Sequence, residues 1–215
     1  MTKQRWNDQG RFVSKRAWVA MFCAVTMGCT GVASAIELDQ VPEAKRSASG
    51  LHLTAVEAAA MKQANPGKVL FIDIRTRAEA MYLGMPTLVD HLVPVLDFPA
   101  EWEWSERQGE YLQQGNPNFV KDIEKRLQQA GLTKDDAVIL ICRSGIRSSS
   151  ASGLLAYYGF KKSYTVVDGY EGDKATSGHE KGTRTVTGRK NDQLPWSFNL
   201  DTVSPRRSAA QWRRR

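Results

Sequence analysis

Five consecutive apolar residues, Ala137 to Ile141, run directly into Cys142 and constrain the fold more than any other part of the chain. A short β-branched run of this length is typical of a buried strand. The residues after Cys142 include Gly145, and the serines from Ser148 onward open a helical pattern. The sequence therefore predicts a strand, a loop and a helix. It places a thiol at the carboxyl end of the strand, where open α/β sheets hold their ligands.

The segment after Cys142 also has the composition of an anion-binding loop. Backbone N–H groups of the loop and of the helix start would converge on the sulfur, and Arg143 and Arg147 add positive charge. Such surroundings favour the thiolate, which is the nucleophilic form of cysteine. Strand-end cysteines are often inert and buried, but the flanking arginines and the glycine argue against that interpretation. We therefore expect Cys142 to be a nucleophile.

The rest of the chain alternates helical and strand patterns. Thr54 to Glu57 is a capping box that opens the first helix, and Asn116 followed by Pro117 predicts an N-cap and a first helical position. Alternation of strands with helices implies an α/β fold, a parallel sheet with helices on both faces. The expected helices cover about residues 54–63, 76–82, 117–130 and 148–158, and the expected strands cover about residues 68–73, 137–141 and 163–167.

Segment 142–148 resembles the active-site loop of the rhodanese family, whose members carry sulfur as a cysteine persulfide. Upstream, Asp73 and Arg75 are similar to the family's strand that ends in Asp-x-Arg. Downstream, residues 166–170 resemble the strand and glycine turn that follow the active-site helix, and residues 188–196 resemble the family's final helix. The four segments stand in the order that the family requires. The resemblance implies a rhodanese-like α/β fold and sulfur transfer through the cysteine.

The resemblance also implies roles for the residues around Cys142. The loop amides would stabilise an anionic persulfide, and Asp73 would position the loop. Two roles are open for Arg75, which would either hold the donor or form a structural ion pair with Asp73 or Glu79. The reaction needs no metal ion and no organic cofactor. The residues expected to bind the small anionic donor are Arg75, Arg143, Ser144, Gly145, Ile146, Arg147 and Ser148.

The length of the loop after Cys142 distinguishes sulfur transfer from the chemistry of phosphatases and arsenate reductases. Arg147 lies five positions after Cys142, whereas related phosphatases and arsenate reductases place an arginine six positions after the cysteine, where this chain has Ser148. A narrower ring of amides suits a sulfane sulfur better than a tetrahedral oxyanion. We therefore expect sulfur transfer from thiosulfate or a persulfide donor to a thiol or cyanide. A phosphatase or arsenate reductase is the less favoured alternative, and the sequence leaves open a non-catalytic rhodanese-like binding module.

The N-terminus has the pattern of a secretory signal peptide over residues 1–35. A basic start is followed by a short apolar stretch and by an Ala-x-Ala exit that ends at Ala35. Cleavage there would remove Cys23 and Cys29, leave Cys142 as the only thiol, and leave no integral membrane segment. We therefore expect a periplasmic protein. An uncleaved membrane anchor is the alternative that the length of the stretch leaves open.

Charge is distributed unevenly along the chain. The net charge of +7 comes from the two ends: residues 1–35 hold five Lys or Arg against one Asp, and the last twelve residues hold five Arg and no acid. The part between them is close to neutral, so a nucleic-acid-binding function is not supported. The expected organisation is a polar lead-in at 36–49, a rhodanese-like domain at 50–200 with inserts at about 95–116 and 171–187, and a disordered Arg-rich tail at 201–215.

The first insert is long, aromatic and acidic, which is typical of a lid or of a surface that binds a protein partner. An equally good interpretation is that Phe98 and a tryptophan only anchor the loop to the core. The second insert is polar and is expected to be an exposed excursion without a metal site.

Overall fold

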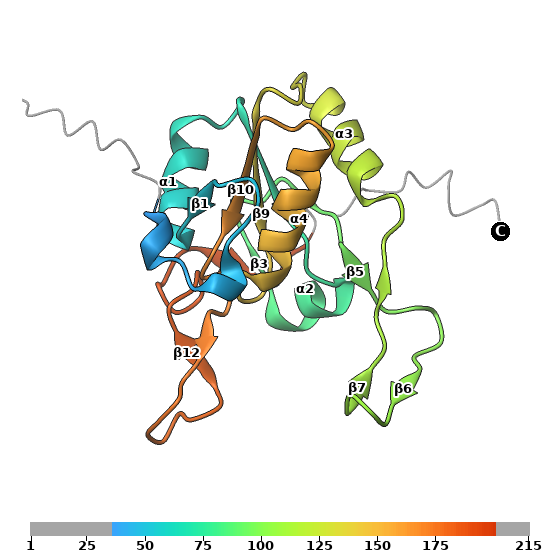
Figure 1. Cartoon of the computed structure of the whole chain (residues 1–215), viewed down its shortest axis with the longest axis vertical. Coiled ribbons are helices and arrows are strands. Elements are labelled where there is room, and N and C mark those ends of the chain that lie inside the picture. Colours follow the sequence, from blue (N-terminus) through green and yellow to red (C-terminus); the bar gives the residue numbers. More distant parts are fainter. Residues whose placement is uncertain (1–35, 201–215) are drawn as a thin grey trace, which may run out of the picture. The chain divides into compact units, whose positions relative to one another are not determined.

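The computed structural model describes residues 36–200, so the predicted signal peptide and the Arg-rich tail lie outside the described residues. The described part is organised around a five-stranded parallel sheet (Figure 1). Its two central neighbours, β9 and β2, pair over their whole length, from Val69 beside Ala137 to Asp73 beside Ile141. The strand order is β1 (His52–Leu53), β10 (Lys162–Val166), β9 (Ala137–Ile141), β2 (Val69–Asp73) and β4 (His91–Leu92). The three inner strands are those predicted from the sequence, and two of them, β2 and β9, are continuous apolar runs apart from Asp73.

Four helices cover the two faces of this sheet. They are α1 (Ala55–Ala64), α2 (Arg77–Leu83), α3 (Phe119–Gln129) and α4 (Ile146–Tyr157). Alternate strand residues face opposite sides: Phe71 and Ile139 lie in an apolar cluster with α1 and α2, and Ile72 and Leu140 lie in a second cluster with α3 and α4. All residues of β2 and β9 are buried, as a sheet covered on both faces requires. The predicted α/β architecture is therefore confirmed.

None of the helices within residues 36–200 is long and apolar enough to cross a lipid bilayer.

Helix starts follow their capping residues. Thr54 and Thr76 each form a full capping box with the glutamate three residues later. The start predicted for α3 is wrong, because the helix begins at Phe119 and not at Pro117. The Asn116 side chain instead accepts a hydrogen bond from the Asn118 N–H at 2.9 Å and donates to the Pro94 carbonyl at 3.0 Å. Asn116 therefore closes a turn that connects the first insert to the helix.

The expected final helix at 188–196 is also wrong. This segment consists of turns and ends in β13 (Trp196–Ser197), which pairs antiparallel with β3 (Met85–Pro86). Gly188 and Gln193 adopt positive φ angles of 89° and 56°, a left-handed backbone that does not continue a right-handed helix. Pro195 also lacks the N–H that a helix would use.

The segment at 36–49, expected as a polar lead-in, packs against the domain. It contains two short 3₁₀ helices, η1 (Leu38–Gln40) and η2 (Glu43–Lys45). Val41 between them is buried, and the Lys45 ammonium lies 2.7 Å from a carboxylate oxygen of Asp173. The segment is therefore tied to the second insert.

The two inserts form hairpins that extend away from α1 and α3 in Figure 1. The first contains two antiparallel pairs, β5 (Leu96–Asp97) with β8 (Gln114–Gly115) and β6 (Trp104–Ser105) with β7 (Glu110–Tyr111). The second pairs β11 (Asp173–Lys174) with β12 (Arg184–Val186).

Candidate active site

The carboxyl ends of the parallel strands bring the predicted site residues to one edge of the sheet. Asp73 at the end of β2 pairs with Ile141 at the end of β9. Cys142 follows directly, and residues 143–145 lead into α4. The Cys142 side chain is almost fully enclosed, with 1% of the residue exposed. The predicted strand, loop and helix are thus present, with the thiol beneath the loop.

The loop surrounds the sulfur with hydrogen-bond donors. Cys142 Sγ accepts from the backbone N–H of Gly145 at 3.2 Å and of Ser148 at 3.3 Å, and it lies 3.5 Å from Ser148 Oγ. These two amides belong to the start of α4, where backbone N–H groups lack partners inside the helix and carry partial positive charge. The arrangement stabilises negative charge on a sulfur atom at this position.

Ser148 supports the loop from below. Its hydroxyl is fully buried, accepts a hydrogen bond from Thr165 Oγ1 at 2.9 Å and lies 3.0 Å from the Gly145 carbonyl, to which it donates. Its N–H faces the sulfur and its side chain faces β10. Ser148 therefore touches Cys142 directly and also fixes the loop to the sheet.

Two glycines allow the loop to approach the turn that follows β10. Gly145 has a φ of 95°, and a Cβ placed on it would lie 2.0 Å from the Val167 carbonyl oxygen. A Cβ on Gly169 would lie 2.7 Å from the Arg143 carbonyl. The close contact is fixed by the Tyr170 N–H, which donates to the Cys142 carbonyl at 2.9 Å. Residues 166–170, singled out by their sequence, thus form the wall against which the loop folds.

Both loop arginines are held by carboxylates. Arg143 Nε donates to Glu171 at 2.9 Å, and Arg147 donates to both oxygens of Glu79 at 2.8 and 2.5 Å. Burial alone would raise the pKa of Glu79, but the hydrogen bonds and charge of Arg147 and the N–H of Thr76 lower it below its ordinary value. The positive charge of each loop arginine is therefore largely balanced by a carboxylate.

Arg75 lies in the interior. Arg75 and Asp73 are both 0% exposed, and the guanidinium donates to the Asp73 carboxylate at 2.6 Å through Nη2 and to the Gly84 carbonyl at 2.8 Å. It also stacks over the Tyr170 ring at 4.0 Å. Of the two roles that the sequence leaves open for Arg75, this burial favours the structural ion pair. A chain of contacts thus links Asp73 through Arg75 and Tyr170 to the Cys142 carbonyl.

A pocket of about 600 Å³ lies over the loop, and we call it the loop pocket. Residues of the loop, the start of α2 and both inserts line it. Its members are Thr76, Ala78, Glu79, Phe98, Glu110, Gln113, Arg143, Ser144, Ile146, Arg147 and Arg184. Both inserts therefore contribute residues to a pocket that the Cys142 loop also lines.

Glu110, Gln113 and Arg184 line the pocket but were not among the predicted site residues, and Arg184 was missed because the second insert was expected to be an exposed excursion. One signal was present: the insert begins directly after the turn at 166–170. It therefore leaves the sheet at the same edge as Cys142.

Comparison with known proteins decides the family. The family model described as the rhodanese-like domain matches residues 54–176, which is more than half of the 215 residues. The chain belongs to the rhodanese-like family. The resemblance stated from the sequence is thereby confirmed, and the family relates the chain to sulfur transfer.

Two curated relatives of this rhodanese-like protein are uncharacterized. RP600 of Rickettsia prowazekii (strain Madrid E) is 28% identical over 127 residues, which are 59% of this chain and 81% of the relative. RC0915 of Rickettsia conorii is 29% identical over 128 residues, with the same two coverages of 59% and 81%.

Two solved structures are similar to this chain. The crystal structure of Rv0390 from M. tuberculosis is 26% identical, with a TM-score of 0.52, and the match covers 69% of this chain and 97% of that one. A solution structure of the polysulfide-sulfur transferase homodimer from Wolinella succinogenes is 25% identical, with a TM-score of 0.37, and the match covers 59% and 72%.

The family match ends at residue 176, so the rhodanese-like part supplies Cys142, its loop and the turn at 166–170, but not Arg184. A lining residue of the loop pocket thus comes from sequence beyond the matched segment.

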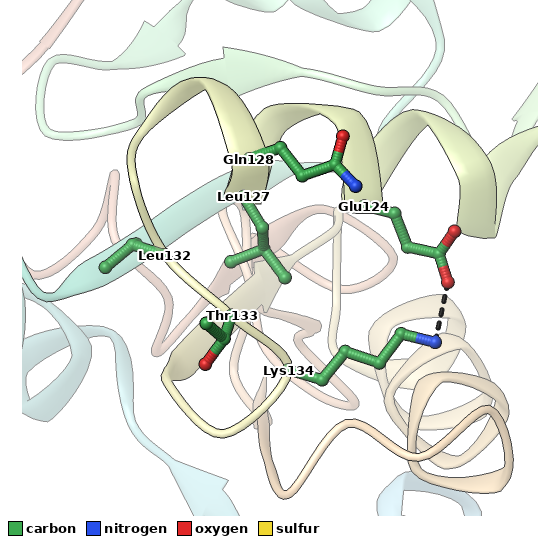
Figure 2. A pocket seen from close by; sticks show the side chains of 6 residues that line it. All are labelled: Glu124, Leu127, Gln128, Leu132, Thr133 and Lys134. Atoms are coloured by element: carbon green, nitrogen blue, oxygen red, sulfur yellow. Dashed lines mark ion pairs between the residues drawn. The ribbon is translucent and has the colours of Figure 1, made fainter.

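A second pocket, of about 370 Å³, lies at the carboxyl end of α3 (Figure 2). Figure 2 shows the Lys134 side chain extended toward Glu124, with which it forms an ion pair of 2.7 Å. Its lining residues are Glu124, Leu127, Gln128, Leu132, Thr133 and Lys134, and none belongs to the Cys142 loop. Within residues 36–200 there is also no group of three or more His, Cys, Asp or Glu side chains placed to hold a metal ion.

Proposed function

We propose that this rhodanese-like protein transfers sulfane sulfur through a persulfide on Cys142. The observation that carries the proposal is the placement of Sγ between the N–H groups of Gly145 and Ser148. An anionic sulfur gains most from such fixed donors, because they need no reorganisation when charge develops. Near-complete enclosure of Cys142 favours the transfer of one terminal atom over reaction with a bulky group.

The loading step is a displacement at sulfur. The Cys142 thiolate attacks the outer sulfur of thiosulfate, a Cys142 S–S bond forms, and the S–S bond of thiosulfate breaks with its electron pair leaving on sulfite. The amides at the start of α4 hold the resulting persulfide anion. In the second step an acceptor, such as cyanide or a thiolate, attacks the outer sulfur and the electron pair returns to Cys142.

Intact mass of the purified protein before and after thiosulfate tests this proposal. We expect a gain of one sulfur atom that cyanide removes, and no gain in Cys142→Ser. Hydrolysis of p-nitrophenyl phosphate by the wild-type protein, with no gain of sulfur, would instead support the phosphatase alternative. A free thiol that gains no sulfur from thiosulfate or from an organic persulfide would overturn the proposal.

We further propose that the first insert binds a protein partner, which is the basis of the binding-module alternative. Trp102 stacks on Phe98 with ring centroids 4.2 Å apart, and Tyr111 packs edge-on against Trp102 and Trp104. Trp102, Trp104 and Tyr111 are each about half exposed, whereas Phe98 lines the loop pocket. Exposed aromatic clusters of this kind are typical of binding surfaces. The cluster therefore lies beside the site that a partner would serve.

The partner proposal is tested with a double variant, Trp102→Ala with Trp104→Ala. We expect it to load with thiosulfate at the wild-type rate and to lose a partner protein that the wild type retains in a crosslinked complex. Retention of that complex by Cys142→Ser together with absence of persulfide in the wild type would favour the binding module. An unchanged complex in the double variant would show that the partner binds elsewhere.

We also propose that the protein acts in the periplasm after cleavage behind Ala35. The sequence of residues 15–35 supports this, and these residues lie outside the described part of the chain. N-terminal sequencing of the protein from a periplasmic fraction is expected to begin at Ile36. A cytoplasmic protein with an intact Met1 would contradict it.

A further inference from the structure

We propose that Arg184 binds a carboxylate of the sulfur donor, so that the loop pocket takes small carboxylated organic persulfides in preference to thiosulfate. This inference rests on the proposed sulfur transfer and names its substrate class.

The first observation is the charge of Arg184. Arg143 and Arg147 are paired with Glu171 and Glu79, whereas Arg184 has no ion-pair partner within residues 36–200. Arg184 Nη1 donates to the Gly172 carbonyl at 2.6 Å. Its Nε is shielded from solvent and makes no hydrogen bond within the described part of the chain. The pocket therefore contains one guanidinium whose charge is not balanced by a neighbouring carboxylate.

The backbone around Arg184 is fixed. Asn191 Nδ2 donates to the Arg184 carbonyl at 3.3 Å and to the Thr187 carbonyl at 2.7 Å. A Cβ placed on Gly172 would lie 2.1 Å from the Val186 carbonyl oxygen, so the two strands of the hairpin approach too closely for a side chain there. Arg184 is thus presented to the pocket from a defined position, which lowers the entropy cost of holding a ligand.

The second observation concerns the other walls of the pocket. Glu110 on β7 also lines it, so an anionic group is favoured on the Arg184 side and disfavoured on the Glu110 side. Phe98 and Ile146 add apolar surface, and Ile146 is 51% exposed. Thiosulfate has no carbon to place on that surface. A pocket of about 600 Å³ has the size that organic ligands occupy.

These features together fit a donor with three parts. Its terminal sulfur enters the loop, its carbon skeleton contacts Phe98 and Ile146, and its carboxylate binds Arg184. The reaction is balanced without an added oxidant. The Cys142 thiolate attacks the outer sulfur of R–S–SH, a Cys142 S–S bond forms, and the donor S–S bond breaks with the electron pair leaving on the thiolate R–S⁻. The proton of the donor stays on the transferred sulfur.

Two donors that differ only in the carboxylate test the inference. These are the persulfides of N-acetylcysteine and of N-acetylcysteine amide, and loading of Cys142 is followed by rapid quench and intact mass. Because a charge-assisted hydrogen bond contributes enough for about a tenfold effect, we expect the wild type to load from the carboxylate donor about tenfold more efficiently. We expect Arg184→Gln to remove that preference by raising KM for the carboxylate donor alone.

Lys174→Gln is the matched control, because Lys174 is an exposed cation of the same hairpin that does not line the loop pocket. It is expected to keep the wild-type preference. Equal use of the two donors by the wild type, or an equal loss for both donors in Arg184→Gln, would overturn the inference while leaving sulfur transfer in place. Absence of persulfide from every donor, thiosulfate included, would instead overturn the proposed function.

Discussion

Arg147 and Glu79 form a two-point ion pair that joins the first turn of α4 to the first turn of α2 beside the loop pocket. The same Glu79 carboxylate accepts the Thr76 N–H at 2.9 Å and so completes the capping box of α2. One side chain therefore caps a helix and holds an arginine of the Cys142 loop. The pair links the two motifs, 142–148 and 73–79, that the sequence places far apart.

We expect Glu79→Gln to destabilise the protein by about 1–3 kcal/mol at pH 7, because a partly buried arginine loses its charged partner. The lowered pKa of Glu79 in the folded state means that this contribution is present above the ordinary value of 4.5. It is lost as the pH falls through the lower folded pKa. Urea unfolding between pH 7 and pH 3 measures the change.

Glu57→Gln is the control for Glu79→Gln. Glu57 completes the capping box of α1 in the same way but pairs with no arginine among the described residues. We expect it to cost less than about 1 kcal/mol. Equal losses for the two variants would show that Arg147 adds nothing to the cap.

The second prediction concerns Asp168, which lies behind the loop. Its carboxylate accepts the Ala55 N–H at 2.8 Å at the start of α1, and burial raises its pKa to about 7. Because the ordinary value is 3.8, the folded state binds the proton more tightly, and stability falls as the pH rises from about 4 through 7. Asn at this position keeps an oxygen acceptor but does not titrate.

We therefore expect the stability of Asp168→Asn, relative to wild type, to improve between pH 4 and pH 8 by an amount on the order of a few kcal/mol. Chemical unfolding at a series of pH values measures it. Parallel pH profiles for the two proteins would mean that Asp168 is ionised in the fold across this range.

A third prediction uses the buried pair of hydroxyls under the loop. Ser148→Ala leaves the Thr165 hydroxyl buried without its acceptor, and we expect a loss of about 1–3 kcal/mol. Adding Thr165→Val removes the orphaned group, so the double variant should lose less than the sum of the two single variants. Thermal or urea unfolding of the four proteins gives the coupling. Strict additivity would show that the two hydroxyls do not interact.

Prediction from sequence works best where one local pattern determines the structure. Strands β2 and β9 and the capping box at Thr54 could be predicted because apolar runs and capping residues act over a few positions. The edge strands β1 and β4 have two residues each, too few for a pattern. Asn116 shows the limit of local rules. Its side chain satisfies the Pro94 carbonyl, a partner 22 positions away.

The residues of the candidate site also differ in how far they could be predicted from the sequence. Cys142, its loop and the two supporting segments could be identified because they are contiguous motifs. The burial of Arg75 and the entry of Arg184 into the loop pocket depend on tertiary packing. No spacing in the sequence distinguishes an arginine that stacks on Tyr170 from one that lines the loop pocket.

The last prediction tests whether the loop geometry itself makes Cys142 reactive. Gly145 and Gly131 both have positive φ angles, 95° and 70°, so alanine strains the backbone at either position. A Cβ on Gly131 meets nothing within 4 Å, whereas a Cβ on Gly145 would lie 2.0 Å from the Val167 carbonyl oxygen. We expect Gly131→Ala to cost about 1–2 kcal/mol and to leave sulfur loading unchanged.

Gly145→Ala has to move the loop away from β10, which removes the Gly145 N–H from the sulfur. We expect it to cost more than about 3 kcal/mol and to slow loading from thiosulfate by at least about tenfold, since one fixed donor to the reacting sulfur is lost. Unfolding curves and rapid-quench mass spectra of both variants measure the two effects. Normal loading by a folded Gly145→Ala protein would mean that the ring of amides is not what activates Cys142.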